Sequence, residues 1–138
     1  MKRAGASIIF YNSLEQVLLF LRDDDATILY PNMWDLPGGH VEPEETPRQC
    51  IVREMKEEME LELSDFDLLN KKEFKDRIEY TFYKHINLRI EQINLHEGQK
   101  LAWFSLEEAT NKTLAYGFHE ILADFVSYIK KEPDSYKS

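Results

Sequence analysis

The chain has 138 residues, of which 43% are hydrophobic, so it is long enough to bury a core within one domain. Its formal net charge of −9 disfavours extended nucleic acid and anionic membranes as partners; a small phosphorylated substrate stays compatible if a divalent cation masks its charge. No segment reaches the roughly 20 apolar residues of a membrane span, and the start of the chain lacks a signal-peptide core. The single Cys50 allows no internal disulfide. We therefore expect one cytoplasmic domain over residues 1–131 and a flexible tail over 132–138.

Short apolar segments predict strands in the first third of the chain. Residues 6–11 and 17–21 are apolar and flank a polar turn, which indicates two neighbouring strands. Residues 22–32 lose all periodicity and include three consecutive aspartates, which we interpret as solvated loop charge, with metal binding as the alternative. Residues 34–39 then predict a strand end that turns sharply at Pro37-Gly38-Gly39.

A helix is predicted after this turn. Thr46 suits the N-cap, Pro47 suits the first turn, and Gln49 stands three residues after Thr46 as in a capping box. The helix should end near Glu60 or Leu61. Its packing face is formed by the apolar residues Ile51, Val52, Met55 and Met59.

The second half of the chain predicts further strands and two helices. Residues 66–74 and 78–88 indicate an antiparallel pair with a turn near Lys75 and Asp76, and residues 101–104 indicate another strand. Ser105 and Glu108 repeat the capping-box pattern for a brief helix. The C-terminal helix has an apolar stripe of Phe118, Ile121, Leu122, Phe125 and Ile129.

Three glutamates of the first helix point to a metal site. Glu54, Glu57 and Glu58 are spaced three and four residues apart, so they are neighbours on a helical surface away from the packing face. Like charges this close repel by roughly 0.2 to 0.5 kcal/mol per pair, so they need open solvent or a cation. Carboxylate oxygens suit Mg²⁺ or Mn²⁺.

The same residues belong to a longer motif that resembles the Nudix box of the Nudix hydrolases, in particular the MutT-like nucleotide pyrophosphohydrolases. The matching positions are Gly39, Glu45, Arg53-Glu54, apolar Met55, Glu57-Glu58 and apolar Leu61. One position departs, because Glu60 stands where the pattern has Gly. Gly near a helix end commonly takes a left-handed conformation that costs other residues roughly 1 kcal/mol, so either Glu60 carries this strain or the helix ends differently.

The resemblance implies an α/β fold, a Nudix-type α/β/α sandwich with a mixed β-sheet. It also implies that Glu54, Glu57 and Glu58, with the Gly39 carbonyl, hold Mg²⁺ or Mn²⁺. Glu45 and Arg53 would then support these ligands, since a guanidinium orients carboxylates and offsets crowded negative charge.

A base must remove a proton from the attacking water. Glu97 lies in a loop position that resembles the source of an extra glutamate in nucleotide-hydrolysing members of the family, so it is a candidate base or further metal ligand. Glu54 and Glu57 are the alternatives. Catalytic roles are thus expected for Glu54, Glu57, Glu97 and Arg53.

The resemblance also suggests a class of substrate. The leading hypothesis is Mg²⁺-dependent hydrolysis of a (deoxy)nucleoside triphosphate to monophosphate and pyrophosphate, with no membrane or nucleic-acid partner and a homodimer suggested by the family. The alternatives are a nucleotide-sugar or dinucleotide polyphosphate hydrolase and a non-catalytic Nudix-fold binding module. Candidate substrate contacts are Trp34, Phe82, Phe118 and His119, although the aromatic side chains also suit the core.

Overall fold

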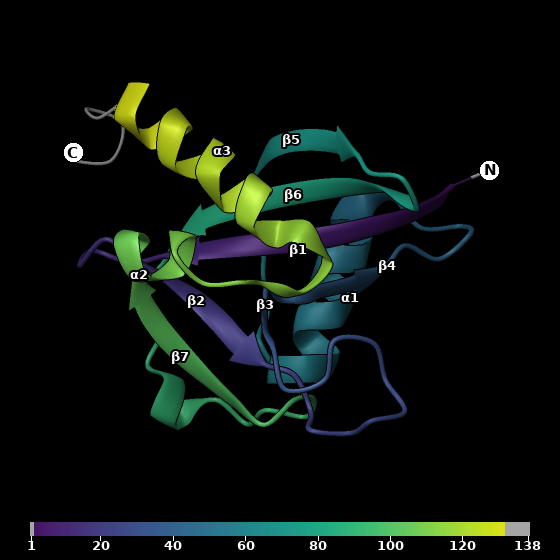
Figure 1. Cartoon of the computed structure of the whole chain (residues 1–138), viewed down its shortest axis with the longest axis horizontal. Helices are drawn as coiled ribbons and strands as arrows, with labels where there is room; N and C mark the ends of the chain where they lie inside the picture. Colours follow the sequence, from purple (N-terminus) through teal and green to yellow (C-terminus); the bar gives the residue numbers. More distant parts are fainter. Residues whose placement is uncertain (1, 132–138) are drawn as a thin grey trace.

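A mixed β-sheet forms the centre of the protein, of which the computed structural model describes residues 2–131. The strand order is β3-β2-β1-β6-β5, with β4 paired to β1 and β7 paired to β2 (Figure 1). The tail predicted over residues 132–138 lies outside the described residues. The strands are β1 (Arg3–Tyr11), β2 (Gln16–Leu21), β3 (Trp34–Asp35), β4 (Gly38–His40), β5 (Asp67–Glu73), β6 (Arg77–His85) and β7 (Lys100–Ser105).

Strand β1 lies in the middle of the sheet and makes it mixed. It pairs in parallel with β6 along its whole length, from Arg3 opposite Arg77 to Tyr11 opposite His85, and antiparallel with β2 and β4. The predicted neighbourhood of the first two strands is confirmed, but β1 begins three residues before the expected Ala6. Its early residues are extended because they pair with β6, a partner distant in the sequence.

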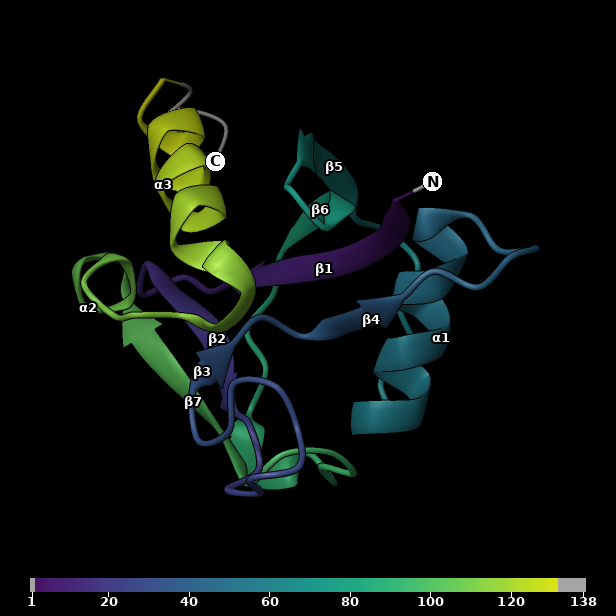
Figure 2. The same ribbon diagram turned by 45° about the vertical axis from the view of Figure 1, so that its right-hand side comes forward.

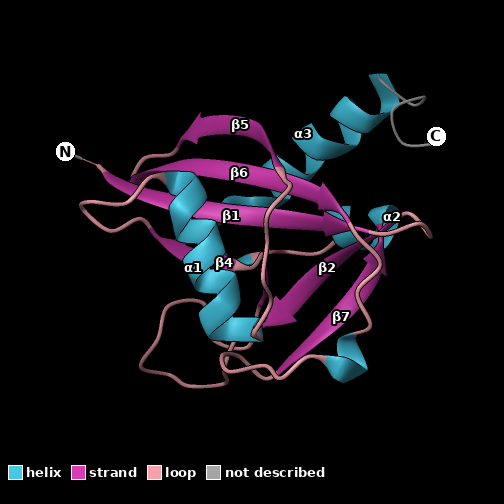
Figure 3. Cartoon of the chain, turned by 180° about the vertical axis from the view of Figure 1, so that it is seen from behind, coloured by secondary structure: helices cyan, strands magenta, loops and turns pink. Residues whose placement is uncertain are grey.

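Helices cover both faces of the sheet, which confirms the predicted α/β/α layering. Helix α1 (Pro47–Met59) lies on one face, while α2 (Leu106–Thr110) and α3 (Phe118–Lys131) lie on the other (Figures 2 and 3). Two apolar clusters fill the spaces between the layers, one beneath α1 and one beneath α2 and α3. No helix within residues 2–131 is long and apolar enough to cross a membrane.

Helix α1 begins and ends as its sequence predicts. The Thr46 side chain accepts a hydrogen bond from the Gln49 backbone N–H, and the Gln49 side chain accepts one from the backbone N–H of Thr46, which completes the capping box. At the other end Glu60 has φ 53° and ψ 37°, so this residue does adopt the left-handed conformation that glycine favours.

The second half of the chain also follows the prediction, with one shortened strand. β5 and β6 pair antiparallel, and α2 starts with a capping box between Ser105 and Glu108. The five residues predicted as the stripe of α3 are its buried residues. Strand β6 ends at His85 rather than at Leu88, immediately before Ile86 donates a backbone hydrogen bond to the Tyr11 carbonyl at the end of β1.

Candidate active site

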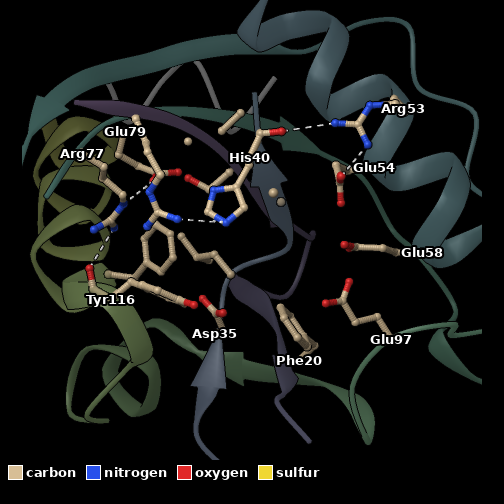
Figure 4. A pocket seen from close by; sticks show the side chains of 18 of the residues that line it. Phe20, Asp35, His40, Arg53, Glu54, Glu58, Arg77, Glu79, Glu97 and Tyr116 are labelled. Carbon is tan, nitrogen blue, oxygen red and sulfur yellow. Dashed lines mark hydrogen bonds and ion pairs between the residues drawn. The ribbon is translucent and has the colours of Figure 1, made fainter. Parts of the chain in front are cut away.

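A cavity of about 530 Å³ opens beside α1 and is lined by residues of β1, β4 and β6 (Figure 4). Carboxylates from α1 and from the loop before β7 line one end of it. The opposite end is lined by Asp35, Arg77, Glu79 and Tyr116. Phe118 also lines the cavity, beside Arg77. The cavity therefore joins a group of acids to an end that combines aromatic and charged side chains.

Helix α1 contributes three glutamates to the lining of this cavity. Its buried residues Ile51 and Met55 pack toward the sheet, which turns Glu54 toward β4. The approach is close, because a Cβ at Gly39 would meet the Glu54 carboxyl carbon at 2.5 Å. Gly39 thus permits the carboxylate to lie directly against the β4 backbone. The Gly39 carbonyl stays the predicted backbone ligand, and Gly39 lines the cavity.

Three carboxylates converge at this end of the cavity. Oxygens of Glu54, Glu58 and Glu97 all lie within 4.8 Å of one another, and Figure 4 shows the three side chains pointing to a common centre. Glu58 is buried, with 7% of its surface exposed. Burial, followed by contact with Glu97 and Glu54, raises the pKa of its carboxyl. A divalent cation would satisfy this set, because it supplies the positive charge that three hard oxygen donors lack.

Glu57 does not join this group, contrary to the expectation that the three helix glutamates converge. Its side chain is 60% exposed and lies 3.4 Å from Arg53, at the cavity wall. The helical geometry explains the difference. At 100° per residue, Glu58 lies about 40° to one side of Glu54, and Glu57 lies about 60° to the other. The group with Glu97 forms on the Glu58 side of Glu54.

Arg53 connects the helix glutamates to the loop before α1. Its guanidinium donates to both oxygens of Glu45, at 2.7 and 3.0 Å, and to Glu54 at 2.6 Å. The hydrogen bonds from Arg53 lower the pKa of Glu45 to about 2, so Glu45 remains ionised at neutral pH. This arrangement holds Glu54 from the side opposite the three-carboxylate centre, as expected of a residue that orients a ligand.

Replacing Arg53 by Lys should lower kcat by about 10- to 100-fold. A lysine ammonium lacks the planar fork that reaches Glu45 and Glu54 together. Steady-state kinetics over a Mg²⁺ titration measure the effect. Arg48→Lys is the matched control, because Arg48 lies on the same helix but donates to the carbonyls of Ser64 and Phe66. Equal activity of both variants would contradict the orienting role.

The loop that contains Glu97 reaches the carboxylates from far along the chain. The backbone N–H of His96 donates to the Glu58 carbonyl at 2.8 Å, and that of Gln99 donates to the Leu21 carbonyl at 2.8 Å. Gly98 between them has φ +81°, and a Cβ there would collide with Phe20 and the Leu21 carbonyl. These contacts bring the Glu97 carboxylate beside Glu54 and Glu58.

The predicted substrate contacts divide into two groups. Phe118 lines the cavity. Phe82 is buried against Phe66 beneath α1, and Trp34 packs edge-on against Phe104 on the α3 side of the sheet. His119 is exposed. Of the four, only Phe118 is among the described residues that line the cavity.

Asp35, a buried acid at the end of the cavity away from α1, was not predicted as a site residue from the sequence. Asp35 is 4% exposed; its Oδ2 accepts from Arg22 at 3.1 Å, whereas its Oδ1 has no hydrogen-bond partner among the described residues. Burial raises the pKa of this carboxyl to about 7, although Arg22 opposes the shift. The available signal was a lone acid between Trp34 and Leu36, within an apolar strand end.

Arg77 was also missed, and it organises the aromatic wall of the cavity. It is buried, pairs with the buried Glu79 at 2.7 Å and donates to the Tyr116 carbonyl at 2.9 Å. Its guanidinium also lies 5.5 Å from the Tyr116 ring centroid and 5.4 Å from that of Phe118. These contacts hold the Tyr116 backbone at φ +57° and place both rings at the cavity.

Comparison with known proteins agrees with this geometry. The sequence model of the NUDIX domain family matches residues 1–125 of this chain. The CTP pyrophosphohydrolase of Escherichia coli is 32% identical over 103 residues, which are 73% of this chain and 76% of that protein. An RNA pyrophosphohydrolase of Hydrogenovibrio crunogenus is 41% identical over 78 residues, 56% of this chain and 46% of that protein. The chain therefore belongs to the Nudix family of pyrophosphohydrolases.

Solved structures show the same fold. A mutT/nudix family protein from Listeria innocua superposes with a TM-score of 0.78 at 21% identity, covering 94% of this chain and 95% of that one. The solution structure of the E. coli ORF135 protein superposes with a TM-score of 0.70 at 29% identity, covering 92% and 91%. The chain spans about three quarters of the CTP pyrophosphohydrolase but less than half of the RNA pyrophosphohydrolase.

Proposed function

We propose that the protein hydrolyses a (deoxy)nucleoside triphosphate to the monophosphate and pyrophosphate with Mg²⁺ as cofactor. The observation that carries this proposal is the convergence of Glu54, Glu58 and Glu97 within 4.8 Å, at one end of a 530 Å³ cavity. The similarity to a protein named CTP pyrophosphohydrolase supports the substrate class. Mn²⁺ would serve the same oxygen ligands.

Each residue at the acidic end has a distinct role in this proposal. Glu54, Glu58 and Glu97, with the Gly39 carbonyl, would hold the cation, which when bound would offset phosphate charge and lower the pKa of a bound water. Arg53 holds Glu54 in place. Glu57 accepts the proton of the attacking water, because it lies at the cavity wall outside the three-carboxylate group. A new P–O bond then forms to the water oxygen, and the bond to the departing pyrophosphate breaks.

The base of the substrate is proposed from the similarity to a protein named CTP pyrophosphohydrolase, which is 32% identical over 103 residues. We therefore propose that the protein hydrolyses CTP faster than UTP.

A panel of substrates tests the function. The protein is incubated with nucleoside triphosphates, nucleotide sugars and dinucleotide polyphosphates in Mg²⁺, and the products are identified by mass. We expect CTP to give CMP and pyrophosphate faster than UTP gives UMP, and we expect EDTA to abolish turnover.

Other outcomes separate the alternatives. Turnover confined to nucleotide sugars or dinucleotide polyphosphates would favour those substrates. Binding without turnover of any compound would favour a regulatory module. Full activity of Glu57→Gln would contradict the assignment of Glu57 as the base.

We further propose that residues 1–131 act as one Nudix domain in the cytoplasm. The free thiol of Cys50 is buried, and burial raises its pKa to about 12, which suits a protein without disulfide chemistry. The homodimer suggested by the resemblance can be tested by light scattering of the purified chain.

A further inference from the structure

The end of α1 carries a side chain where its backbone favours glycine. Glu60 has φ 53°, and its N–H donates to the Lys56 carbonyl, while the N–H of Leu61 donates to the Met55 carbonyl. These bonds close the helix around a left-handed residue. Glycine adopts this conformation without steric penalty, whereas a glutamate here carries backbone strain. Any compensating interaction must come from the Glu60 side chain.

That side chain reaches the loop of Glu97. Glu60 Oε2 lies 2.6 Å from His96 Nε2, and the backbone N–H of His96 donates to the Glu58 carbonyl at 2.8 Å. The loop is thus attached twice to the last turn of α1, once through its backbone and once through a side chain. We call the Glu60–His96 contact the clasp. The residue after His96 is Glu97, whose carboxylate belongs to the three-carboxylate group.

The other side of the loop is attached to a different part of the fold. Gln99 donates through its backbone to Leu21 and through its side-chain amide to the Arg22 carbonyl and Asn32 Oδ1. The loop therefore lies between α1 and the end of β2. Without the clasp, the backbone hydrogen bond from His96 to the Glu58 carbonyl and the contact between the Glu97 and Glu58 carboxyl groups would remain between the loop and α1.

We propose that Glu60 is a positioning residue, which acts through the clasp to set the place of Glu97 opposite Glu58 and thereby raises the affinity of the site for its cation. This inference rests on the proposed metal role of Glu54, Glu58 and Glu97. Both side chains of the clasp are about half exposed, at 53% and 54%, so solvent screens the contact. We expect its loss to weaken cation binding by about two- to fivefold.

Direct Mn²⁺ binding tests the clasp without any substrate. Calorimetry or electron paramagnetic resonance gives the Kd for the wild type, Glu60→Gly, Glu60→Gln, His96→Ala and the Glu60→Gly/His96→Ala double variant. We expect Glu60→Gly to raise the Kd by about two- to fivefold, while its metal-free melting temperature stays equal or rises because glycine relieves the backbone. Glu60→Gln keeps an acceptor for the imidazole N–H and should restore part of the affinity.

The double variant and a matched control complete the design. If the two residues act through their mutual contact, the Kd of the double variant for Mn²⁺ is no larger than the larger Kd of the two single variants. Glu62→Gln removes the exposed Lys56–Glu62 pair at the same helix end and should leave Kd unchanged. An unchanged Kd in Glu60→Gly, or additive losses in the double variant, would overturn the clasp alone. Absence of Mn²⁺ binding by the wild type would overturn the metal site and the clasp together.

Discussion

Glu58→Gln is expected to lower kcat/KM by at least about a hundredfold. The substitution removes a ligand charge of the proposed metal ion, and stabilisation of transition-state charge by a metal ion is worth several kcal/mol. Glu58 is the most buried of the three carboxylates that converge in the cavity, so its loss should also weaken Mn²⁺ binding. Initial rates at saturating and limiting nucleotide, together with calorimetric Mn²⁺ titration, measure both effects.

Two controls separate this loss from misfolding and from loss of the base. The pKa of the Glu58 carboxyl is raised by burial and by its acidic neighbours, so its ionised form is unfavourable in the metal-free protein. Metal-free Glu58→Gln should consequently be at least as stable as the wild type at pH 8. Glu57→Gln should lose kcat but retain Mn²⁺ affinity. A Glu58→Gln variant with wild-type activity would refute the proposed centre.

Asp35→Asn is expected to remove a pH-dependent part of the free energy of unfolding, on the order of 4 kcal/mol between pH 4 and pH 7. Burial raises the pKa of Asp35 from 3.8 to about 7 in the folded protein. The folded state therefore holds this proton more tightly than the unfolded state. The resulting stabilisation is complete below about pH 4 and is lost as the pH rises to about 7.

Urea denaturation in EDTA between pH 4 and pH 8 tests this linkage. The free energy of unfolding of the wild type, minus that of Asp35→Asn, should fall as the pH rises across this range. Asp24→Asn, at an exposed loop aspartate, is the matched control and should follow the wild type. A difference between wild type and Asp35→Asn that does not vary with pH would show that Asp35 is not buried with a raised pKa.

Much of the fold was predictable because the signals are local. Thr46 and Gln49 cap α1 through groups three residues apart, and the stripe beginning at Phe118 follows the helical period of α3. The early start of β1 was not predictable, since Arg3 is extended only by pairing with β6. The burial of Phe82 likewise follows from the helix that covers it.

For the candidate site, the sequence by itself determined which acids stand on one helix. It also determined that Glu60 occupies the position where the motif has glycine, so that the end of the helix was either strained or altered. Only the tertiary structure decided that Glu58 rather than Glu57 converges with Glu54, and that Glu97 joins them from a distant loop. It also decided that Asp35 is buried with one oxygen that has no hydrogen-bond partner among the described residues. The reason is physical. Capping and periodicity depend on residues a few positions apart, whereas the convergence of carboxylates from separate elements depends on how α1, β4 and the loop before β7 pack together.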